Sequence, residues 1–234
     1  MKCLVTGATG LIGIPLVKAL VAEGWNVNAL CRSREKAVMI EGTGVTIIYG
    51  DITSEESLRV AVKGCSSLFH LAAYARIWHK NKDYYHTVNV KATASLFRIA
   101  AEEGVKRIVH VSTAGVLGPS DSTIVDENSP DPEKYFTYYE ESKANAEVLA
   151  RQYNSDDMPV ITVNPSRLYG AGLQGESNSV TDLILRYLTG KWHFLPGNGK
   201  RIGNYAYLDD VVNGMILAME RGKGGERYIL GGDD

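Results

Sequence analysis

Two side chains in the segment TYYEESKANAE have types and spacing that suit proton transfer. Tyr139 and Lys143 are four residues apart, so on a helix the phenol and the ammonium share one face. A nearby cation favours the phenolate and lowers the tyrosine pKa toward the working pH, which makes Tyr139 a candidate general acid or base. Tyr187 and Lys191 have the same spacing, but Gly190 is expected to end their helix before the lysine.

A hydroxyl that could work with Tyr139 occurs upstream, in the segment VSTAGVLG. Ser112 and Thr113 follow an apolar run that predicts a strand, so both should lie at the carboxyl end of that strand. A hydroxyl at this place can hold a substrate carbonyl or alcohol beside the phenol. The alternative is a turn hydroxyl that bonds its own backbone, which is a stronger alternative for Ser112 than for Thr113.

The first thirteen residues, MKCLVTGATGLIG, indicate a phosphate site. Gly7, Gly10 and Gly13 follow a short apolar strand at three-residue spacing, and an apolar helical pattern begins directly after them. A strand that turns into a helix leaves the first helical N–H groups free, and the positive end of the helix dipole adds to their attraction for a pyrophosphate. Gly7 would permit the turn, Gly10 the close approach of the phosphate, and Gly13 the packing of helix on strand. The alternative, that the glycines serve only for packing, would explain Gly13 but not Gly7 and Gly10 together.

The segment after the second predicted strand, 27–31, bears on the choice of cofactor. In dinucleotide-binding folds an acidic residue at the end of this strand usually binds the ribose 2′-hydroxyl, but here no carboxylate occurs before Glu35. The chain instead offers Arg32, Arg34 and Lys36, and a 2′-phosphate needs cationic donors. We therefore expect NADP, with Arg32 as the main contact. If this basic turn is only a solvated surface, NAD is the alternative.

These candidate residues need strands and helices to position them, and the hydrophobic pattern predicts both in alternation over the first 165 residues. The expected strands span 2–6, 27–31, 45–49, 67–71, 107–112 and 159–164, and the expected helices 12–22, 54–63, 81–103 and 138–153. Alternation of this kind gives parallel strands with right-handed crossovers, so we expect an α/β fold with a doubly wound parallel sheet. Ligands bind at the carboxyl strand ends of such a sheet, which is where the candidate residues fall.

The composition argues against several other classes of protein. The 234 residues carry a formal net charge of −2 and 44% hydrophobic residues, typical of a globular protein with a full core, and no basic excess indicates nucleic-acid binding. The longest apolar runs are strand-sized, so we expect no membrane span and no signal peptide. Cys3, Cys31 and Cys65 have no metal-ligand spacing, so we expect no metal site and a cytoplasmic location.

Eight segments, in order along the chain, resemble those of one enzyme family: TGATGLIG, GDIT, LFHLAA, VNVKAT, VSTAGVLG, YYEESK, NPSRLYG and YAYLDDVVNG. On these motifs the chain resembles an extended short-chain dehydrogenase/reductase, in the branch of the dihydroflavonol 4-reductases, 3β-hydroxysteroid dehydrogenases and NAD-dependent epimerases/dehydratases. The resemblance implies a Rossmann sheet, with residues 1–165 as the dinucleotide-binding domain and 166–234 as a partial substrate lobe interleaved with the last sheet elements. Family members usually continue beyond the GGDD of this chain, so the resemblance also implies a truncated lobe.

The resemblance implies roles for individual residues. Thr113 would orient the substrate, Tyr139 would be the acid/base and Lys143 would hold the nicotinamide ribose, while Asn89 would support the site. The cofactor-binding set would be Gly7, Thr9, Gly10, Leu11, Ile12, Gly13, Arg32, Asp51, Ile52, Leu71, Ala72, Ala73, Tyr139, Lys143, Pro165 and Ser166. Three pairs in this set have implied places: Asp51 and Ile52 at the adenine, Ala72 and Ala73 at the nicotinamide, and Pro165 and Ser166 at its carboxamide.

The function expected from these features is that of an NADP-dependent, dihydroflavonol-reductase-like oxidoreductase. It would transfer a hydride between the nicotinamide and a hydrophobic alcohol or carbonyl compound. A hydrophobic substrate fits if the aromatic and apolar residues near the nicotinamide converge, and ordinary packing of the lobe is the alternative for this set: Tyr74, Ile77, Trp78, His79, Trp192 and Phe194.

Two other functions stay open. A nucleotide-sugar epimerase or dehydratase would use the same three residues with a tightly bound NAD, and Arg201 could meet the diphosphate of its substrate. A redox sensor would bind NADP without chemistry, although such a protein can dispense with the Tyr139–Lys143 pair. We expect a small-molecule substrate, no nucleic-acid or membrane partner, and leave open a homodimer through the helix at 138–153 and the helix before it.

Overall fold

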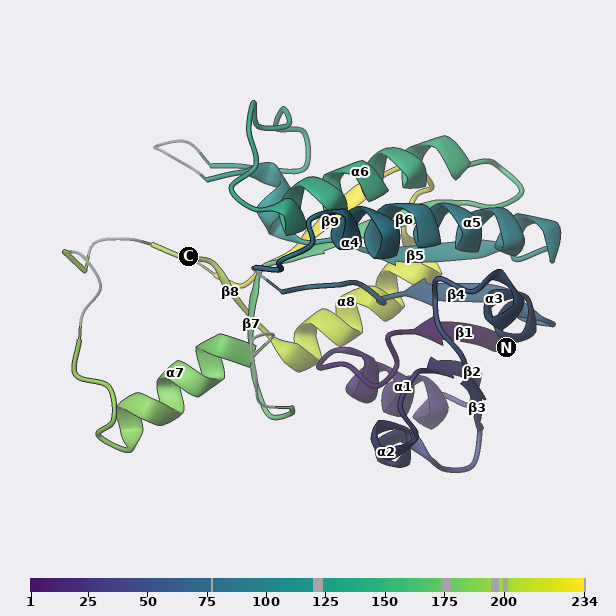
Figure 1. The fold of residues 1–234 in the computed structure, drawn as a ribbon, viewed down its shortest axis with the longest axis horizontal. Coiled ribbons are helices and arrows are strands. Elements are labelled where there is room, and N and C mark those ends of the chain that lie inside the picture. The colour runs from purple at the N-terminus through teal and green to yellow at the C-terminus, as the bar shows by residue number, and fades with distance from the viewer. Residues whose placement is uncertain (77, 120–123, 174–177, 195–197, 200–201, 234) are drawn as a thin grey trace.

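The computed structural model describes residues 1–76, 78–119, 124–173, 178–194, 198–199 and 202–233. Its main sheet has the strand order β3-β2-β1-β4-β5-β6-β9, and all neighbours are parallel (Figure 1). The strands are β1 (Lys2–Thr6), β2 (Asn26–Cys31), β3 (Val45–Tyr49), β4 (Ser67–His70), β5 (Arg107–Val111), β6 (Val160–Pro165) and β9 (Arg227–Leu230). The order runs outward from β1 to β3 and then restarts on the other side of β1 with β4, so the predicted doubly wound parallel sheet is confirmed.

Helices cover both faces of this sheet (Figure 1). One face carries α1 (Gly13–Ala22) and α8 (Leu208–Arg221), and the other carries α3 (Glu55–Val62), α5 (Ala92–Glu102) and α6 (Tyr138–Tyr153). The apolar stripe of each helix enters a separate hydrophobic cluster, with Leu16 and Met215 fully buried on the first face and Leu58 and Leu96 on the second. The two clusters hold the carboxyl strand ends at one edge, where a ligand can reach them.

Helix α6, which carries Tyr139 and Lys143, begins where its sequence predicts. The Thr137 side chain accepts a hydrogen bond from the Glu140 backbone N–H, and the Glu140 carboxylate accepts one from the Thr137 N–H. This capping box satisfies two N–H groups that the helix would otherwise leave free. The first turn of α6, which includes Tyr139, is therefore fixed by local interactions.

The helix predicted over 81–103 is the clearest departure from the expected elements. The structure divides it into α4 (Asp83–Tyr85), a π-helical turn over His86–Lys91 and α5. Asn89 lies within the π turn, and its side chain bonds to groups outside the helix. A π turn of this kind places an extra residue in the helix and is frequent at functional sites.

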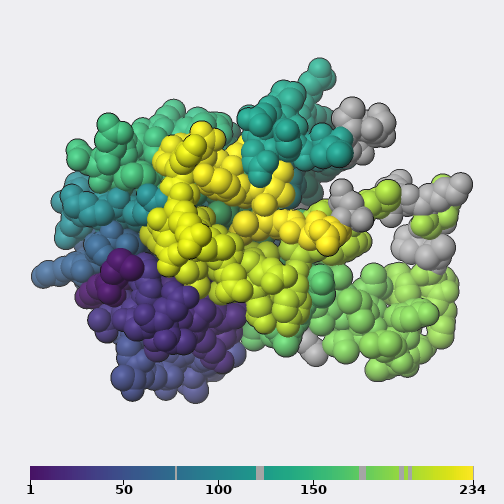
Figure 2. Space-filling model, turned by 180° about the vertical axis from the view of Figure 1, so that it is seen from behind, coloured from purple at the N-terminus to yellow at the C-terminus, as the bar shows by residue number. Residues whose placement is uncertain are grey.

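The C-terminal third adds a smaller set of elements. A two-stranded parallel sheet consists of β7 (Arg167–Tyr169) and β8 (Tyr205–Tyr207), and α7 (Ser179–Leu188) lies to the side of the main body in both views (Figure 1, Figure 2). Strand β9 returns to the main sheet beside β6. The division into 1–165 and 166–234 stays a prediction. Within the described ranges, no helix is long and apolar enough to cross a bilayer.

Candidate functional site

A cavity of about 770 Å³ lies at the carboxyl ends of the main-sheet strands. Its volume is in the range of small-molecule and cofactor sites. Most of the predicted site residues line it: Gly7, Thr9, Gly10, Leu11, Ile12, Gly13, Arg32, Ile52, Leu71, Ala72, Ala73, Thr113, Tyr139, Pro165 and Ser166. Three predicted residues, Asp51, Asn89 and Lys143, lie behind or beside this wall.

The glycine turn has the geometry that a closely approaching phosphate requires. Gly7 has φ +70°, and a Cβ there would come within 2.8 Å of the Ala72 backbone nitrogen. A Cβ on Gly13 would collide with the Gly7 carbonyl and lie 2.8 Å from the Ala8 backbone. The N-terminus of α1 has no side-chain cap at Ile12 and no acidic residue in its first turn, so its positive end is available to an anion.

The basic turn after β2 contributes Arg32, Ser33 and Lys36 to the cavity wall. Arg34 instead stacks on the ring of Tyr49, with 4.3 Å between the guanidinium carbon and the ring centroid. The side chain of Ser33 caps the short helix α2 (Arg34–Ala37) by accepting from the Lys36 N–H. The turn therefore presents two cations to this end of the cavity.

Asp51 lies next to Arg32 rather than in the wall. One carboxylate oxygen accepts hydrogen bonds from the Thr53 N–H and hydroxyl, and the other lies 3.9 Å from Arg32 Nη1. Partial burial alone would raise the pKa of Asp51, but these hydrogen bonds and the guanidinium hold that pKa below its ordinary value. Asp51 is thus held as an anion beside Arg32.

Tyr139 and Thr113 line the same cavity, and Lys143 is buried behind them at 2% exposure. The turn hydrogen bond expected more for Ser112 is made instead by Thr113, whose hydroxyl accepts from the Gly115 N–H because Thr113 caps a short helical segment. The expected lowering of the tyrosine pKa by Lys143 is not found. Burial, followed by the Glu140 carboxylate, raises the pKa of Tyr139 to about 12. Burial lowers the pKa of Lys143 to about 8, against an opposing effect of Glu147. The phenol is therefore protonated at neutral pH, which is the form needed for an acid.

Asn89 supports the site from the π turn. Its Oδ1 accepts a hydrogen bond of 2.7 Å from the Tyr74 N–H, and its Nδ2 donates to the Tyr74 carbonyl and to Ser142 Oγ. Ser142 is next to Lys143 on α6, and Tyr74 follows the β4 strand end. Asn89 thus ties the loop after β4 to the helix that carries Tyr139.

Two hydroxyls on the cavity wall lack protein partners. Ser112 Oγ and Ser166 Oγ are buried and have no hydrogen-bond partner among the residues that the structure describes. A buried polar group without a partner is costly, so both hydroxyls suit a polar group of a bound molecule. With the glycine turn and the basic turn, they make the cavity fit a nicotinamide dinucleotide.

The apolar residues near the nicotinamide strand converge only in part. Tyr74 lines the cavity, as do Tyr84 and Val88, and the rings of Tyr74 and Tyr84 meet edge to face at 4.8 Å. His79 stacks on Tyr84. The remaining members of the predicted set do not join this wall: Trp78 and Phe194 are 76% and 75% exposed, Trp192 lines a smaller hollow beside α7, and Ile77, like Arg201, lies outside the described residues.

Sequence reasoning missed several wall residues and the support behind the wall. Leu30 and Tyr84 line the cavity but lie outside the eight motifs, and Gly50, Val88 and Arg167 lie within motifs but were given no role. Also missed were Glu147 and Asn164, two buried polar residues joined by a hydrogen bond behind Thr113 and Lys143. Within the described ranges, no group of three or more His, Cys, Asp or Glu could hold a metal ion.

Comparisons with known proteins agree with this geometry. The chain matches the NAD dependent epimerase/dehydratase family over residues 3–231. It is 35% identical to the 4-hydroxy-2-methyl-3-oxo-4-farnesyl-3,4-dihydroquinoline-1-oxide ketoreductase of Stigmatella aurantiaca, over 98% of this chain and 68% of that one. A putative dihydroflavonol 4-reductase of Synechocystis is 31% identical over 97% and 66% of the two chains.

A solved structure extends the likeness to three dimensions. The dTDP-glucose 4,6-dehydratase of Streptomyces venezuelae, with NAD bound, superposes with a TM-score of 0.87 at 28% identity, over 100% of this chain and 76% of that one. The chain spans about two thirds of the length of the curated relatives named here.

Proposed function

The chain belongs to the NAD dependent epimerase/dehydratase family, among the extended short-chain dehydrogenases/reductases, and from this premise we propose an NADP-dependent oxidoreductase. It transfers a hydride between the nicotinamide and a hydrophobic alcohol or carbonyl compound. The observation that carries the proposal is that Thr113 and Tyr139 line one cavity with the glycine turn of β1 and α1.

In the reductive direction Tyr139 Oη donates its proton to the carbonyl oxygen of the substrate, and in the oxidative direction it takes the proton from the alcohol. The Thr113 hydroxyl bonds to the same oxygen and orients it. The nicotinamide, when bound, supplies or accepts the hydride. A raised tyrosine pKa of about 12 keeps the acid protonated, and an ammonium that approaches the phenol when cofactor and substrate are bound would stabilise the phenolate left after transfer. This is the role of Lys143, which also holds the nicotinamide ribose.

The remaining predicted residues bind and position the cofactor. Gly7, Thr9, Gly10, Leu11, Ile12 and Gly13 accommodate the pyrophosphate at the α1 N-terminus, which has no side-chain cap. Asp51 and Ile52 border the adenine. Leu71, Ala72 and Ala73 leave room at the nicotinamide, and Pro165 and Ser166 bind its carboxamide. NADP is favoured over NAD because Arg32 and Lys36 line the adenosine end of the cavity and can bond to a 2′-phosphate.

A hydrophobic substrate is supported by the wall on the nicotinamide side. Tyr74, Tyr84 and Val88 present rings and a branched side chain there. The relative from Stigmatella aurantiaca is named for a ketone that carries a farnesyl chain. Apolar walls with a few placed hydroxyls are typical of sites for such molecules.

The direct test is the variant Tyr139→Phe, with NADPH consumption measured on a panel of hydrophobic ketones and aldehydes. We expect turnover to fall by roughly 10²–10⁴-fold, the usual contribution of a positioned general acid, and the dissociation constant for NADPH to stay within about threefold. The neighbouring Tyr138→Phe is the matched control, because Tyr138 is 43% exposed and outside the cavity wall. Equal turnover in Tyr139→Phe and Tyr138→Phe would refute the assignment of the acid.

A nucleotide-sugar epimerase or dehydratase is the second candidate. It is favoured by the fold likeness to a dTDP-glucose 4,6-dehydratase with NAD bound, which covers the whole chain. Such an enzyme keeps its nucleotide and consumes none in net terms. A stoichiometric NAD that survives purification, with conversion of a nucleotide sugar, would favour this candidate. Binding of NADPH without turnover on any substrate would favour a redox sensor.

Two further expectations belong to the proposal. A homodimer through α5 and α6 is supported by exposed apolar side chains on α6, including Val148 at 42% exposure, and sedimentation at graded concentrations tests it. A cytoplasmic location is supported by the free thiols of Cys3, Cys31 and Cys65, which are all buried. Localising a tagged protein in the cell tests it.

A further inference from the structure

Glu147 is a buried carboxylate that the proposed chemistry leaves unused. It lies on α6 one turn after Lys143 and is 3% exposed. An ionised carboxylate is costly to bury unless other groups pair with it and hydrogen-bond to it. Glu147 has three such partners: Asn164 Nδ2 at 2.7 Å, Arg227 Nη1 at 3.7 Å and Arg151 Nη1 at 3.8 Å.

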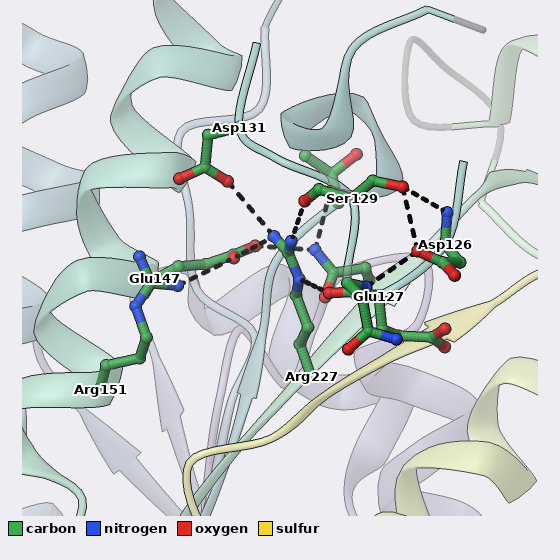
Figure 3. A network of polar contacts seen from close by, with 10 residues as sticks. Asp126, Glu127, Ser129, Asp131, Glu147, Arg151 and Arg227 are labelled. Atoms are coloured by element: carbon green, nitrogen blue, oxygen red, sulfur yellow. Dashed lines mark hydrogen bonds and ion pairs between the residues drawn. The ribbon is translucent and has the colours of Figure 1, made fainter. Parts of the chain in front are cut away.

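Arg227 is the partner that comes from farthest along the chain (Figure 3). It reaches from β9 toward α6, and its side chain is 15% exposed. The guanidinium donates to the carbonyls of Glu127 and Ser129 at 2.7 and 2.8 Å and pairs with Asp131 at 3.4 Å. The loop over 126–131 thus fixes this cation, and Asp131 shares Nη1 with Glu147, so the guanidinium stays next to the Glu147 carboxylate.

Asn164 connects Glu147 to the candidate site. Its Nδ2 donates to Glu147 Oε1 and also, at 3.1 Å, to the backbone carbonyl of Thr113. Thr113 is the cap of a short helical segment, Ala114–Leu117, and its hydroxyl accepts from the Gly115 N–H. A single amide therefore joins the carboxylate on α6 to the backbone that carries the Thr113 hydroxyl.

Glu147 is also one helical turn from Lys143 on α6, and its charge acts on that lysine. Lys143 in turn acts on two titratable groups of the sheet, His70 on β4 and His110 on β5, which are both buried. Burial and the Lys143 charge lower the pKa of both histidines, so they are neutral at pH 7. Burial lowers the pKa of Lys143, and the charge of Glu147 opposes this effect. Because the two histidines are neutral, Glu147 is the charged group that offsets the burial of the ammonium.

We propose that Glu147 is a positioning residue for this site, with two separable effects. Its hydrogen bond fixes Asn164, and through Asn164 the Thr113 backbone. Its charge keeps Lys143 an ammonium despite burial. The consequence for turnover rests on the proposed function, whereas the two physical effects exist in the protein without substrate.

Two variants separate the effects. Glu147→Gln keeps an oxygen that can accept from Asn164 but removes the charge. Glu147→Asp keeps the charge but withdraws it from Asn164 by one methylene. Glu141→Gln is the matched control, because Glu141 is an exposed carboxylate on the same helix. Thermal unfolding of all three variants is recorded first, to establish that each one is folded before it is compared with wild type.

The first readout is the titration of Lys143, by NMR of protein labelled at the lysine side chains. The Lys143 resonance is assigned by its loss in Lys143→Arg. We expect the Lys143 pKa to fall by about one unit or more in Glu147→Gln, the usual effect of removing a nearby opposite charge, and to stay near wild type in Glu147→Asp and Glu141→Gln. The alkaline limb of ketone reduction should move to lower pH with the lysine.

The second readout is how the kinetic effect divides between kcat and the binding of NADPH. We expect Glu147→Asp to lower kcat by about tenfold or more, the scale of a small misplacement of a reacting group, with the dissociation constant for NADPH nearly unchanged. If both Glu147 variants are merely less stable, with wild-type lysine titration and wild-type kcat, the positioning role is overturned. If wild type reduces no carbonyl compound, the proposed function fails, and the lysine titration still decides the electrostatic half of the inference.

Discussion

The two buried histidines under the site predict how the free energy of unfolding depends on pH. The His70 and His110 rings lie 5.2 Å apart between β4 and β5. His70 exchanges hydrogen bonds with Thr6 and Thr93, while neither ring nitrogen of His110 has a partner among the described residues. Burial, with a smaller effect of Lys143, lowers the His70 pKa to about 3 and the His110 pKa well below its ordinary value.

The sign and size of the effect follow from proton linkage. Because both folded-state pKa values lie below the unfolded value of about 6.5, the unfolded chain binds more protons below that pH, and stability is lost as the pH falls. Between pH 7 and pH 5 each histidine that stays neutral in the fold costs about 2 kcal/mol. The pair therefore removes about 4 kcal/mol, a large part of the 5–15 kcal/mol typical of a domain.

The assay is urea unfolding at steps between pH 7 and pH 5, which stays above the range where most carboxylates titrate. His110→Phe keeps an aromatic ring of similar size and should remove about half of the decline. The exposed His193 provides the control His193→Gln, which should follow wild type. A wild-type free energy of unfolding that is flat over this range, or an undiminished decline in His110→Phe, would refute the placement of two neutral histidines in the core.

Two other predictions concern the cofactor end of the cavity. Arg32→Gln should weaken NADPH by roughly 10-fold, as expected for one partly exposed charge-assisted hydrogen bond, and leave NADH within about twofold; equal weakening of both nucleotides in a fluorescence titration would remove Arg32 from the 2′-phosphate site. Gly7→Ala should lower the free energy of unfolding in urea by about 2–5 kcal/mol, because the cost of a left-handed backbone adds to the cost of overpacking. Gly24→Ala, at φ +82° with open space around it, should cost only about 1–2 kcal/mol, and equal costs would contradict the close packing of Gly7 on Ala72.

Most of the fold could be predicted because the signals for it are local. The bounds of α6 follow from an amphipathic pattern, and the doubly wound parallel sheet follows from the alternation of strands and helices. The division of the helix predicted over 81–103 could not be foreseen in this way. It depends on the hydrogen bonds of Asn89 to Tyr74 and Ser142, which lie 15 and 53 residues away in the chain.

The site was predictable where a motif marks it and hidden where only tertiary packing does. The glycine turn, Thr113 and Tyr139 all reach the cavity. Glu147 looks like any acidic residue on an amphipathic helix, and its burial depends on Asn164 and Arg227 from two distant strands. The pKa of Tyr139 was expected to fall because Lys143 is four residues away, but burial of the phenol is the larger effect.

The measurement that tests the proposed function most directly is the identity and affinity of the bound nucleotide. The purified protein is denatured, any released nucleotide is identified, and the refolded or stripped protein is titrated with NADPH and NADH. An NADP-dependent reductase should retain little nucleotide and bind NADPH more tightly than NADH. Stoichiometric, slowly exchanging NAD would contradict that function, support a nucleotide-sugar epimerase or dehydratase, and make the basic turn after β2 an ordinary surface.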